Sequence, residues 1–146
     1  MQTDQQTLVI ETPGRGSTEI TNQVAKAVRS ARIQTGLCQV FVRHTSASLM
    51  ITENADPGVR VDLETLLARF APDGDPEYEH DDEGEDDMAA HARSLLTGSS
   101  ISVPIGNSRL LLGTWQGIYL YEHRRHPHRR ELIITLIGSR GAHESR

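Results

Sequence analysis

The feature that most constrains this chain is an apolar run near its C-terminus, Leu-Ile-Ile-Thr-Leu-Ile at residues 132–137. The run is far shorter than the roughly 18 residues that span a bilayer. Continuous aliphatic side chains over this length predict a strand that is covered on both faces. At 146 residues the chain suits one domain, and its aromatic content of 4% leaves most of the core to aliphatic side chains.

Periodicity and turn residues divide the rest of the chain into helices and strands. We expect three helices, at residues 17–32, from 56–57 to 70, and from 86 or 87 to 98. Apolar faces are expected on the second helix at Val59, Leu63, Leu66, Leu67 and Phe70, and on the third at Met88, Ala92, Leu95 and Leu96. Strands are expected at 7–12, 37–43, 46–53, 100–104, 110–113, 116–122 and 131–138. This order predicts an α+β domain with a large sheet or sandwich-like element.

Charge is concentrated in two segments of opposite sign. Residues 77–87 contain eight acids and no Lys or Arg, whereas residues 124–130 read Arg-Arg-His-Pro-His-Arg-Arg. Each segment is either a solvated loop or one half of a facing pair, and either one could gather a charged ligand. The net charge of −5 argues against general nucleic-acid binding.

The strongest local candidate for chemistry is a group of His80, Asp87 and His91. Asp87 and His91 are four residues apart, so they share one face of the expected third helix. Two imidazoles and one carboxylate suit a divalent metal, and the same residues also suit an acid–base pair. An inward-facing histidine is also common as an ordinary hydrogen-bonded core residue, so all three interpretations stay open.

Three further groups follow expected strand ends or bends. His44, Thr45 and Ser46 lie between two strands, where a ligand site and a turn satisfied by hydroxyl groups are equally consistent. Glu53 and Asn54 end the next strand, and both a functional and a structural role are open for them. The last group includes Gln116, flanked by the sole tryptophan and a glycine, and Glu122, which ends the same strand; a buried Gln116 amide would require partners.

In chain order these groups resemble the YjbQ-like family of secondary thiamine-phosphate synthases. The motifs are His-Thr-Ser-Ala at 44–47, Glu-Asn-Ala-Asp-Pro at 53–57, Asp-Leu-Glu at 62–64, Tyr-x-His at 78–80, Asp-Asp-Met-x-x-His at 86–91, Ser-Leu-Leu-Thr-Gly at 94–98, Leu-Gly-Thr-Trp-Gln-Gly-Ile-Tyr at 112–119 and Glu-His at 122–123. The resemblance runs from about residue 5 to 139. It implies one domain over 1–146, with a frayed tail after 139, that assembles as a homotrimer.

The resemblance also implies a reaction and a set of site residues. A pyrimidine methyl diphosphate is joined to a thiazole phosphate, and pyrophosphate leaves. His80, Asp87 and His91 would hold a divalent metal, zinc or magnesium, or bind phosphate directly. The remaining roles are phosphoryl binding by His44, Thr45 and Ser46, orientation of the organic part by Gln116 and Glu122, and closure of the site by Glu53 or Asn54. The many acids nearby would repel a diphosphate unless a metal or a protonated histidine compensates.

Two other functions compete with this transferase. One is a metal-dependent hydrolase of another phosphorylated small molecule, and the other is a trimeric protein that binds a small anion without turnover. Cys38 is the only cysteine, which excludes an intramolecular disulfide and fits a reducing compartment. The first residues lack the basic patch and apolar core of a secretory signal. We therefore expect a soluble cytoplasmic protein with no membrane or nucleic-acid partner.

Overall fold

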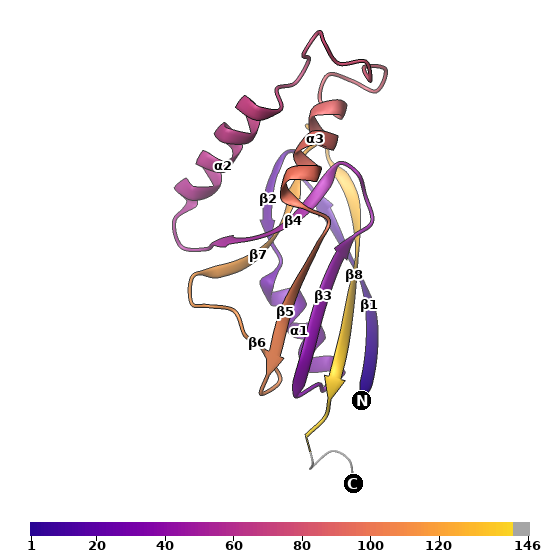
Figure 1. The fold of residues 1–146 in the computed structure, drawn as a ribbon, viewed down its shortest axis with the longest axis vertical. Coiled ribbons are helices and arrows are strands. Elements are labelled where there is room, and N and C mark those ends of the chain that lie inside the picture. Colours follow the sequence, from indigo (N-terminus) through magenta and orange to yellow (C-terminus); the bar gives the residue numbers. More distant parts are fainter. Residues whose placement is uncertain (142–146) are drawn as a thin grey trace.

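Two antiparallel sheets organise residues 1–141, the part of the chain described by a computed structural model (Figure 1). Residues 142–146, the end of the expected tail, lie outside the described residues. In chain order the elements are β1 (Gln2–Thr12), β2 (Gly16–Glu19), α1 (Thr21–Ala31), β3 (Thr35–Val42), β4 (Ala47–Glu53), α2 (Pro57–Phe70), α3 (Asp87–Thr97), β5 (Ser100–Gly106), β6 (Arg109–Leu110), β7 (Gln116–Glu122) and β8 (His128–Ser139). The predicted α+β class with three helices is confirmed.

The larger sheet has the strand order β1-β8-β3-β5-β6. In it β8 pairs with β1 over residues 128–138 and with β3 over residues 132–139. The apolar run lies within β8, where Leu132, Ile134 and Leu136 are buried in one core with α1. On the opposite face Ile133 is only half-buried and Ile137 is 41% exposed. The predicted cover on both faces is therefore wrong within one chain, because α1 covers only one of them.

The smaller sheet has the order β2-β7-β4, and α3 lies against β4. Helix α2 begins as predicted, because the Asp56 side chain accepts a hydrogen bond of 2.8 Å from the Gly58 amide and Pro57 occupies the first turn. The helix then stands away from both sheets (Figure 1) and contains no buried residue. Its predicted apolar face is only partly covered within one chain, because Leu66 is 56% and Phe70 69% exposed. The other three residues of that face, Val59, Leu63 and Leu67, are half-buried.

Some predicted boundaries are wrong, mainly where pairing is long-range. The helix predicted from residue 17 begins at Thr21, because residues 16–19 form β2 and pair with β7. Strand β1 extends back to Gln2 because β8 offers a partner over its whole length. The strand predicted at 110–113 is reduced to β6, whose two residues pair only with the end of β5.

Helix α3 does not bury the apolar face that the sequence predicts. Its buried residues are Asp87, Ala89, Ala90 and Arg93, whereas Leu95 is 86% exposed. The small alanines allow α3 to approach β4 closely, and the buried Arg93 guanidinium is satisfied by the Ala71 carbonyl and by Glu64. A paired charge and two methyl groups therefore set the rotation of this helix.

No helix among residues 1–141 has the combination of length and hydropathy that crossing a bilayer requires.

The same Leu→Ala change should strongly affect the free energy of unfolding at one position and hardly affect it at another. Leu136 is fully buried in β8, so Leu136→Ala should lower the free energy of unfolding by about 2–5 kcal/mol. Leu95 is exposed on α3, so Leu95→Ala should change it by less than about 0.5 kcal/mol. Urea unfolding followed by circular dichroism measures both, and equal losses would contradict the exposed position of Leu95.

Candidate functional site

The first turns of α3 and the loop before it bring His80, Asp87 and His91 together. Asp87 Oδ2 lies 2.6 Å from His80 Nε2 and 3.2 Å from His91 Nε2. One possible ligand atom from each of the three residues lies within 4.8 Å of the others. Asp87 is buried, while both imidazoles are partly exposed, so the cluster has an anionic floor and an open side.

Hydrogen bonding fixes which nitrogen of His91 carries the proton. His91 Nδ1 lies 2.9 Å from the Thr45 carbonyl oxygen, which can only accept, so Nδ1 must donate. In the neutral ring Nε2 is then unprotonated and points a lone pair at the Asp87 carboxylate. Two acceptors at 3.2 Å require a positive species between or beside them, either a proton on Nε2 or a metal ion.

The charge state of Asp87 favours the binding of a cation at the cluster. Burial raises the pKa of Asp87, but its hydrogen bond with His80 and the charges of His91 and Arg124 outweigh burial, and the pKa lies below its ordinary value. The hydrogen bond to Asp87 in turn raises the pKa of His80. Asp87 is therefore an anion at neutral pH, and the donor set of two imidazoles and one carboxylate fits a divalent transition metal.

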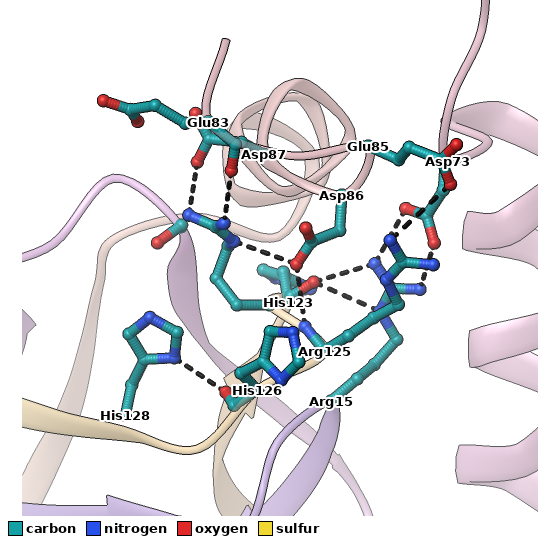
Figure 2. Close-up of polar contacts among 12 residues, drawn as sticks. Arg15, Asp73, Glu83, Glu85, Asp86, Asp87, His123, Arg125, His126 and His128 are labelled. Carbon is teal, nitrogen blue, oxygen red and sulfur yellow. Dashed lines mark hydrogen bonds and ion pairs between the residues drawn. The ribbon is translucent and has the colours of Figure 1, made fainter. Parts of the chain in front are cut away.

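The acidic and basic segments face each other beside this cluster. Arg124 donates to Asp86 Oδ2 at 2.9 Å and to Asp87 Oδ1 at 2.7 Å, and the Arg125 amide also donates to Asp86. Burial raises the pKa of Asp86, but the hydrogen bonds from Arg124 and Arg125 prevail and lower it to about 2. Figure 2 shows Asp86 and Asp87 above the connection between β7 and β8 that carries Arg125 and His126. The two segments therefore contact each other, but only through Arg124 and Arg125 of the basic run.

A groove of about 660 Å³ adjoins the cluster and shares His91 with it. Phe41 and Leu95 supply apolar side chains to this groove, while His44 and Ser94 supply polar ones. Both large apolar side chains are exposed, at 43% for Phe41 and 86% for Leu95. The groove can therefore accept an apolar ring next to groups that bind polar substituents.

His44 presents a neutral N–H donor in this groove. Its Nε2 accepts a hydrogen bond of 2.8 Å from the Glu131 amide, so the proton of the neutral ring is on Nδ1. Burial and the charge of Arg130 lower the pKa of His44, which keeps the ring neutral. Among residues 1–141 Nδ1 has no hydrogen-bond partner, which leaves it available to a ligand. His44 thus shares the groove with His91 but is not part of the three-residue cluster.

Ser46 and Glu122 belong to a buried ion pair rather than to the groove. Glu122 binds Arg130 through both carboxylate oxygens and also accepts from Thr12 at 2.7 Å. Arg130 donates in addition to Ser46 Oγ at 3.0 Å. Burial raises the pKa of Glu122, but the hydrogen bonds from Arg130 and Thr12 prevail and lower it. These contacts occupy both residues in joining the two sheets. Thr45, in contrast, lines the groove and accepts from His91.

Glu53, Asn54 and Gln116 lie at the other end of β4 and β7. Ala47 pairs with Glu122 near α3, and Glu53 pairs with Gln116 six residues further along, which is about 20 Å at strand spacing. Glu53 accepts from the Ala55 and Asp56 amides, and Gln116 accepts from the Gly113 amide. Within one chain the structure does not bring these three residues to the histidine cluster.

One unusual group, His123, belongs to the Glu-His motif at 122–123, but no signal in the sequence predicts its burial. The ring is fully buried, and its Nε2 lies 2.7 Å from Ser48 Oγ. Its Nδ1 is the one buried side-chain nitrogen or oxygen without a hydrogen-bond partner in the part of the chain that the structure describes. Burial lowers the pKa of His123 to about 3, so the ring is neutral. Strand β7 is buried at every position after Gln116, so no alternation along it marks His123, the next residue, as buried.

Known proteins resemble this chain in sequence and in fold. The profile of the UPF0047 YjbQ-like proteins matches residues 6–139. UPF0047 protein sll1880 of Synechocystis sp. is 50% identical over 134 residues, which cover 92% of this chain and 91% of that protein. UPF0047 protein YjbQ of Escherichia coli O157:H7 is 42% identical over 135 residues, which cover 92% and 97%. The crystal structure of the conserved hypothetical protein TT1486 of Thermus thermophilus has a TM-score of 0.80 at 38% identity and covers 90% of this chain and 98% of its own.

The buried His123 should make stability fall in mild acid. A group whose folded pKa is depressed contributes fully above its unfolded value, here 6.5, and loses that contribution as the pH falls toward about 3. The free energy of unfolding should therefore decrease from pH 7 to pH 4.5. In His123→Gln this decrease should be smaller, whereas the exposed control His126→Gln should keep the wild-type slope. Urea unfolding across this pH range measures the three slopes, and identical slopes would contradict the neutral buried ring.

Proposed function

The chain belongs to the UPF0047 YjbQ-like family, and from that premise we propose that it is a metal-dependent enzyme acting on phosphorylated small molecules, with secondary thiamine-phosphate synthase activity as its specific reaction. The observation that carries the proposal is the cluster of His80, Asp87 and His91 at the edge of an apolar groove. Kinship supports a shared fold, and the chemistry is argued from this cluster.

The donor set fits a resident divalent cation. His91 Nε2 and the Asp87 carboxylate are two acceptors that face each other. His91 donates a hydrogen bond from its other ring nitrogen, Nδ1, to a backbone carbonyl, as metal-binding histidines usually do. Two nitrogen ligands favour zinc or a similar transition metal over magnesium, which prefers oxygen ligands. Such an ion would supply positive charge for a leaving diphosphate.

The proposed reaction is a substitution at the methylene carbon of the pyrimidine substrate. The carbon–oxygen bond to the diphosphate breaks, and its electron pair leaves with pyrophosphate. The thiazole ring nitrogen donates the pair for the new carbon–nitrogen bond, so the balance needs no proton and no oxidant. In this scheme His44 Nδ1 donates to a phosphoryl oxygen, and Phe41 and Leu95 flank the heterocyclic ring.

A hydrolase acting on another phosphorylated molecule is the second candidate. The observation that favours it is access of water to the cluster, because the His80 side chain is 42% exposed and that of His91 is 29% exposed. A transferase must exclude water from its reacting carbon, whereas a hydrolase uses it. The same three residues serve both reactions, so product analysis separates them.

We also propose that the chain assembles as a homotrimer. Support comes from the outer face of the larger sheet, where Leu37 is 44% and Ile137 is 41% exposed and the two pair directly in the register of β3 and β8. Apolar side chains on an open sheet face are stabilised when a second surface covers them. The uncovered side chains of α2 provide a second apolar surface.

Removing His91 should abolish metal binding and turnover together. Wild-type protein should bind about one Zn²⁺ per chain and form thiamine phosphate from the two precursors. His91→Ala removes a direct ligand. Its metal affinity should therefore fall by more than the ~10–100-fold that is typical when an outer partner of a metal site is lost. The control His126→Ala, which removes an exposed imidazole near the site, should behave as wild type.

Zn²⁺ titration and product chromatography measure binding and turnover. Release of inorganic phosphate from other phosphorylated compounds, without thiamine phosphate, would favour the hydrolase. Metal binding without turnover of any phosphorylated compound would contradict both enzymes, and an absence of metal binding would contradict the centre itself.

A charge on the outer sheet face should disrupt the trimer. Leu37→Glu places a carboxylate in the proposed interface, so light scattering should show a shift from trimer toward monomer. Gln23→Glu adds the same charge on an exposed position of α1 and should leave the trimer intact. A wild-type monomer, or a trimer unchanged by Leu37→Glu, would contradict this interface.

A further inference from the structure

We propose that Arg124 is a positioning residue that holds Asp87 and the loop of His80 in the geometry that binds the metal. The inference rests on the proposed function, because it concerns the same cluster. Arg124 is no part of the cluster, and in this arrangement it acts only through the residues that it orients.

All three nitrogens of the Arg124 guanidinium are used within the loop and the start of α3. Nε donates to Asp86 Oδ2 at 2.9 Å, Nη1 donates to Asp87 Oδ1 at 2.7 Å, and Nη2 donates to the Glu83 carbonyl at 2.9 Å. A planar guanidinium with donors in fixed directions can hold three acceptors at once, which an ammonium on a flexible stem cannot do in the same geometry. Three of the five N–H donors of Arg124 are thus committed to the loop and to the start of α3.

The base of Arg124 is anchored in the joint between the sheets. Its amide donates to Glu122 Oε2 at 3.1 Å, and Glu122 is itself buried and paired with Arg130. Arg124 therefore transmits a fixed position from the sheets to a loop that has little secondary structure of its own.

Two consequences for the cluster follow from these contacts. With Oδ1 held by Arg124, the Asp87 carboxylate is fixed in the rotation that turns Oδ2 toward His80 and His91. The contact with the Glu83 carbonyl ties down the segment that carries His80. The His80 ring itself is held by a hydrogen bond to Asp87, a looser ion pair of 3.7 Å with Asp82, and the His91 ring at a centroid distance of 5.4 Å. Without Arg124 both the carboxylate and one imidazole lose their orientation.

Two possible effects of Arg124, through its charge or through the geometry that it imposes, predict opposite changes in metal affinity when it is removed. A guanidinium beside a bound cation repels it, so if only charge mattered, removing Arg124 would strengthen metal binding. If Arg124 positions the ligands, removing it weakens binding, because loss of an outer partner of a metal site typically costs about 10–100-fold in affinity. Arg124→Gln removes both charge and geometry, whereas Arg124→Lys keeps the charge and loses the planar fork.

Arg125 provides a matched control. It is the next residue along the chain, yet its side chain is 47% exposed and reaches only Glu85, at 3.7 Å. Substitution of Arg125 by Lys or Gln changes the same segment without touching the cluster, and the Gln variant removes the same charge as Arg124→Gln.

The test is Zn²⁺ titration against a competing chelator, together with absorption of the Co²⁺-loaded proteins and thermal unfolding without metal. We expect both Arg124 variants to bind Zn²⁺ about 10–100-fold more weakly than wild type and to show altered Co²⁺ absorption. Both Arg125 variants should stay within about twofold of wild type. Metal-free unfolding temperatures separate a lost orientation from a general loss of folding.

The following results would overturn the proposal. Tighter binding by Arg124→Gln would show that charge dominates, and equal losses in the Arg124 and Arg125 variants would show a general effect of the segment. Unchanged binding in both Arg124 variants overturns the positioning role alone, whereas a wild-type protein that binds no Zn²⁺ removes the proposed centre as well. If both Arg124 variants fail to fold, Asp86→Asn decides, because it weakens the Nε acceptor: weaker binding supports the proposal and unchanged binding overturns it.

Discussion

The buried pair of Glu122 and Arg130 is the contact on which the rest of this structure depends. Glu122 ends β7 of the smaller sheet, and Arg130 belongs to β8 of the larger one, so the pair joins the sheets at the end where α3 lies. Both side chains are almost fully buried, and removal of either would leave an uncompensated charge at a cost of about 3–5 kcal/mol. Because Arg124 bonds to the same carboxylate through its amide, the histidine cluster takes its position from this joint.

Charge compensation also explains how an acidic loop can border the site proposed for an anionic substrate. Asp73 forms a two-point ion pair with Arg15, and Asp86 and Asp87 share the guanidinium of Arg124. Asp73, Asp86 and Asp87 are thus neutralised by arginines from other parts of the chain. The repulsion that the acidic segment would exert on a diphosphate, if its charges were free, is correspondingly reduced.

The sequence predicted well those features that depend on neighbours along the chain. Strand β7, the capped start of α2 and the shared helix face of Asp87 and His91 all follow from local patterns. It failed where distant segments compete with a local signal. Residues 16–19 carry helix-start residues but pair with β7, about 100 positions later. Helix α3 buries Arg93 in place of its leucines, because Glu64 and a backbone carbonyl form hydrogen bonds with that guanidinium.

The same limit applies to the site residues. A polar residue at a strand end gives the same sequence pattern whether it binds a substrate or forms a hydrogen bond with a buried partner. Strand direction then separates Gln116 from the cluster by the length of β7, which no spacing in the sequence reveals.

Phe41 connects the two apolar surfaces of the chain and with them the two proposals. It lies on the outer face of β3, the face that also carries Leu37, and it lines the groove beside His91. A second copy seated on that sheet face would therefore also cover part of the groove, and with it the route by which water reaches the cluster. Since exclusion of water is what distinguishes transfer from hydrolysis at such a site, the choice between the two proposed reactions would depend on the proposed assembly as much as on the three proposed ligands.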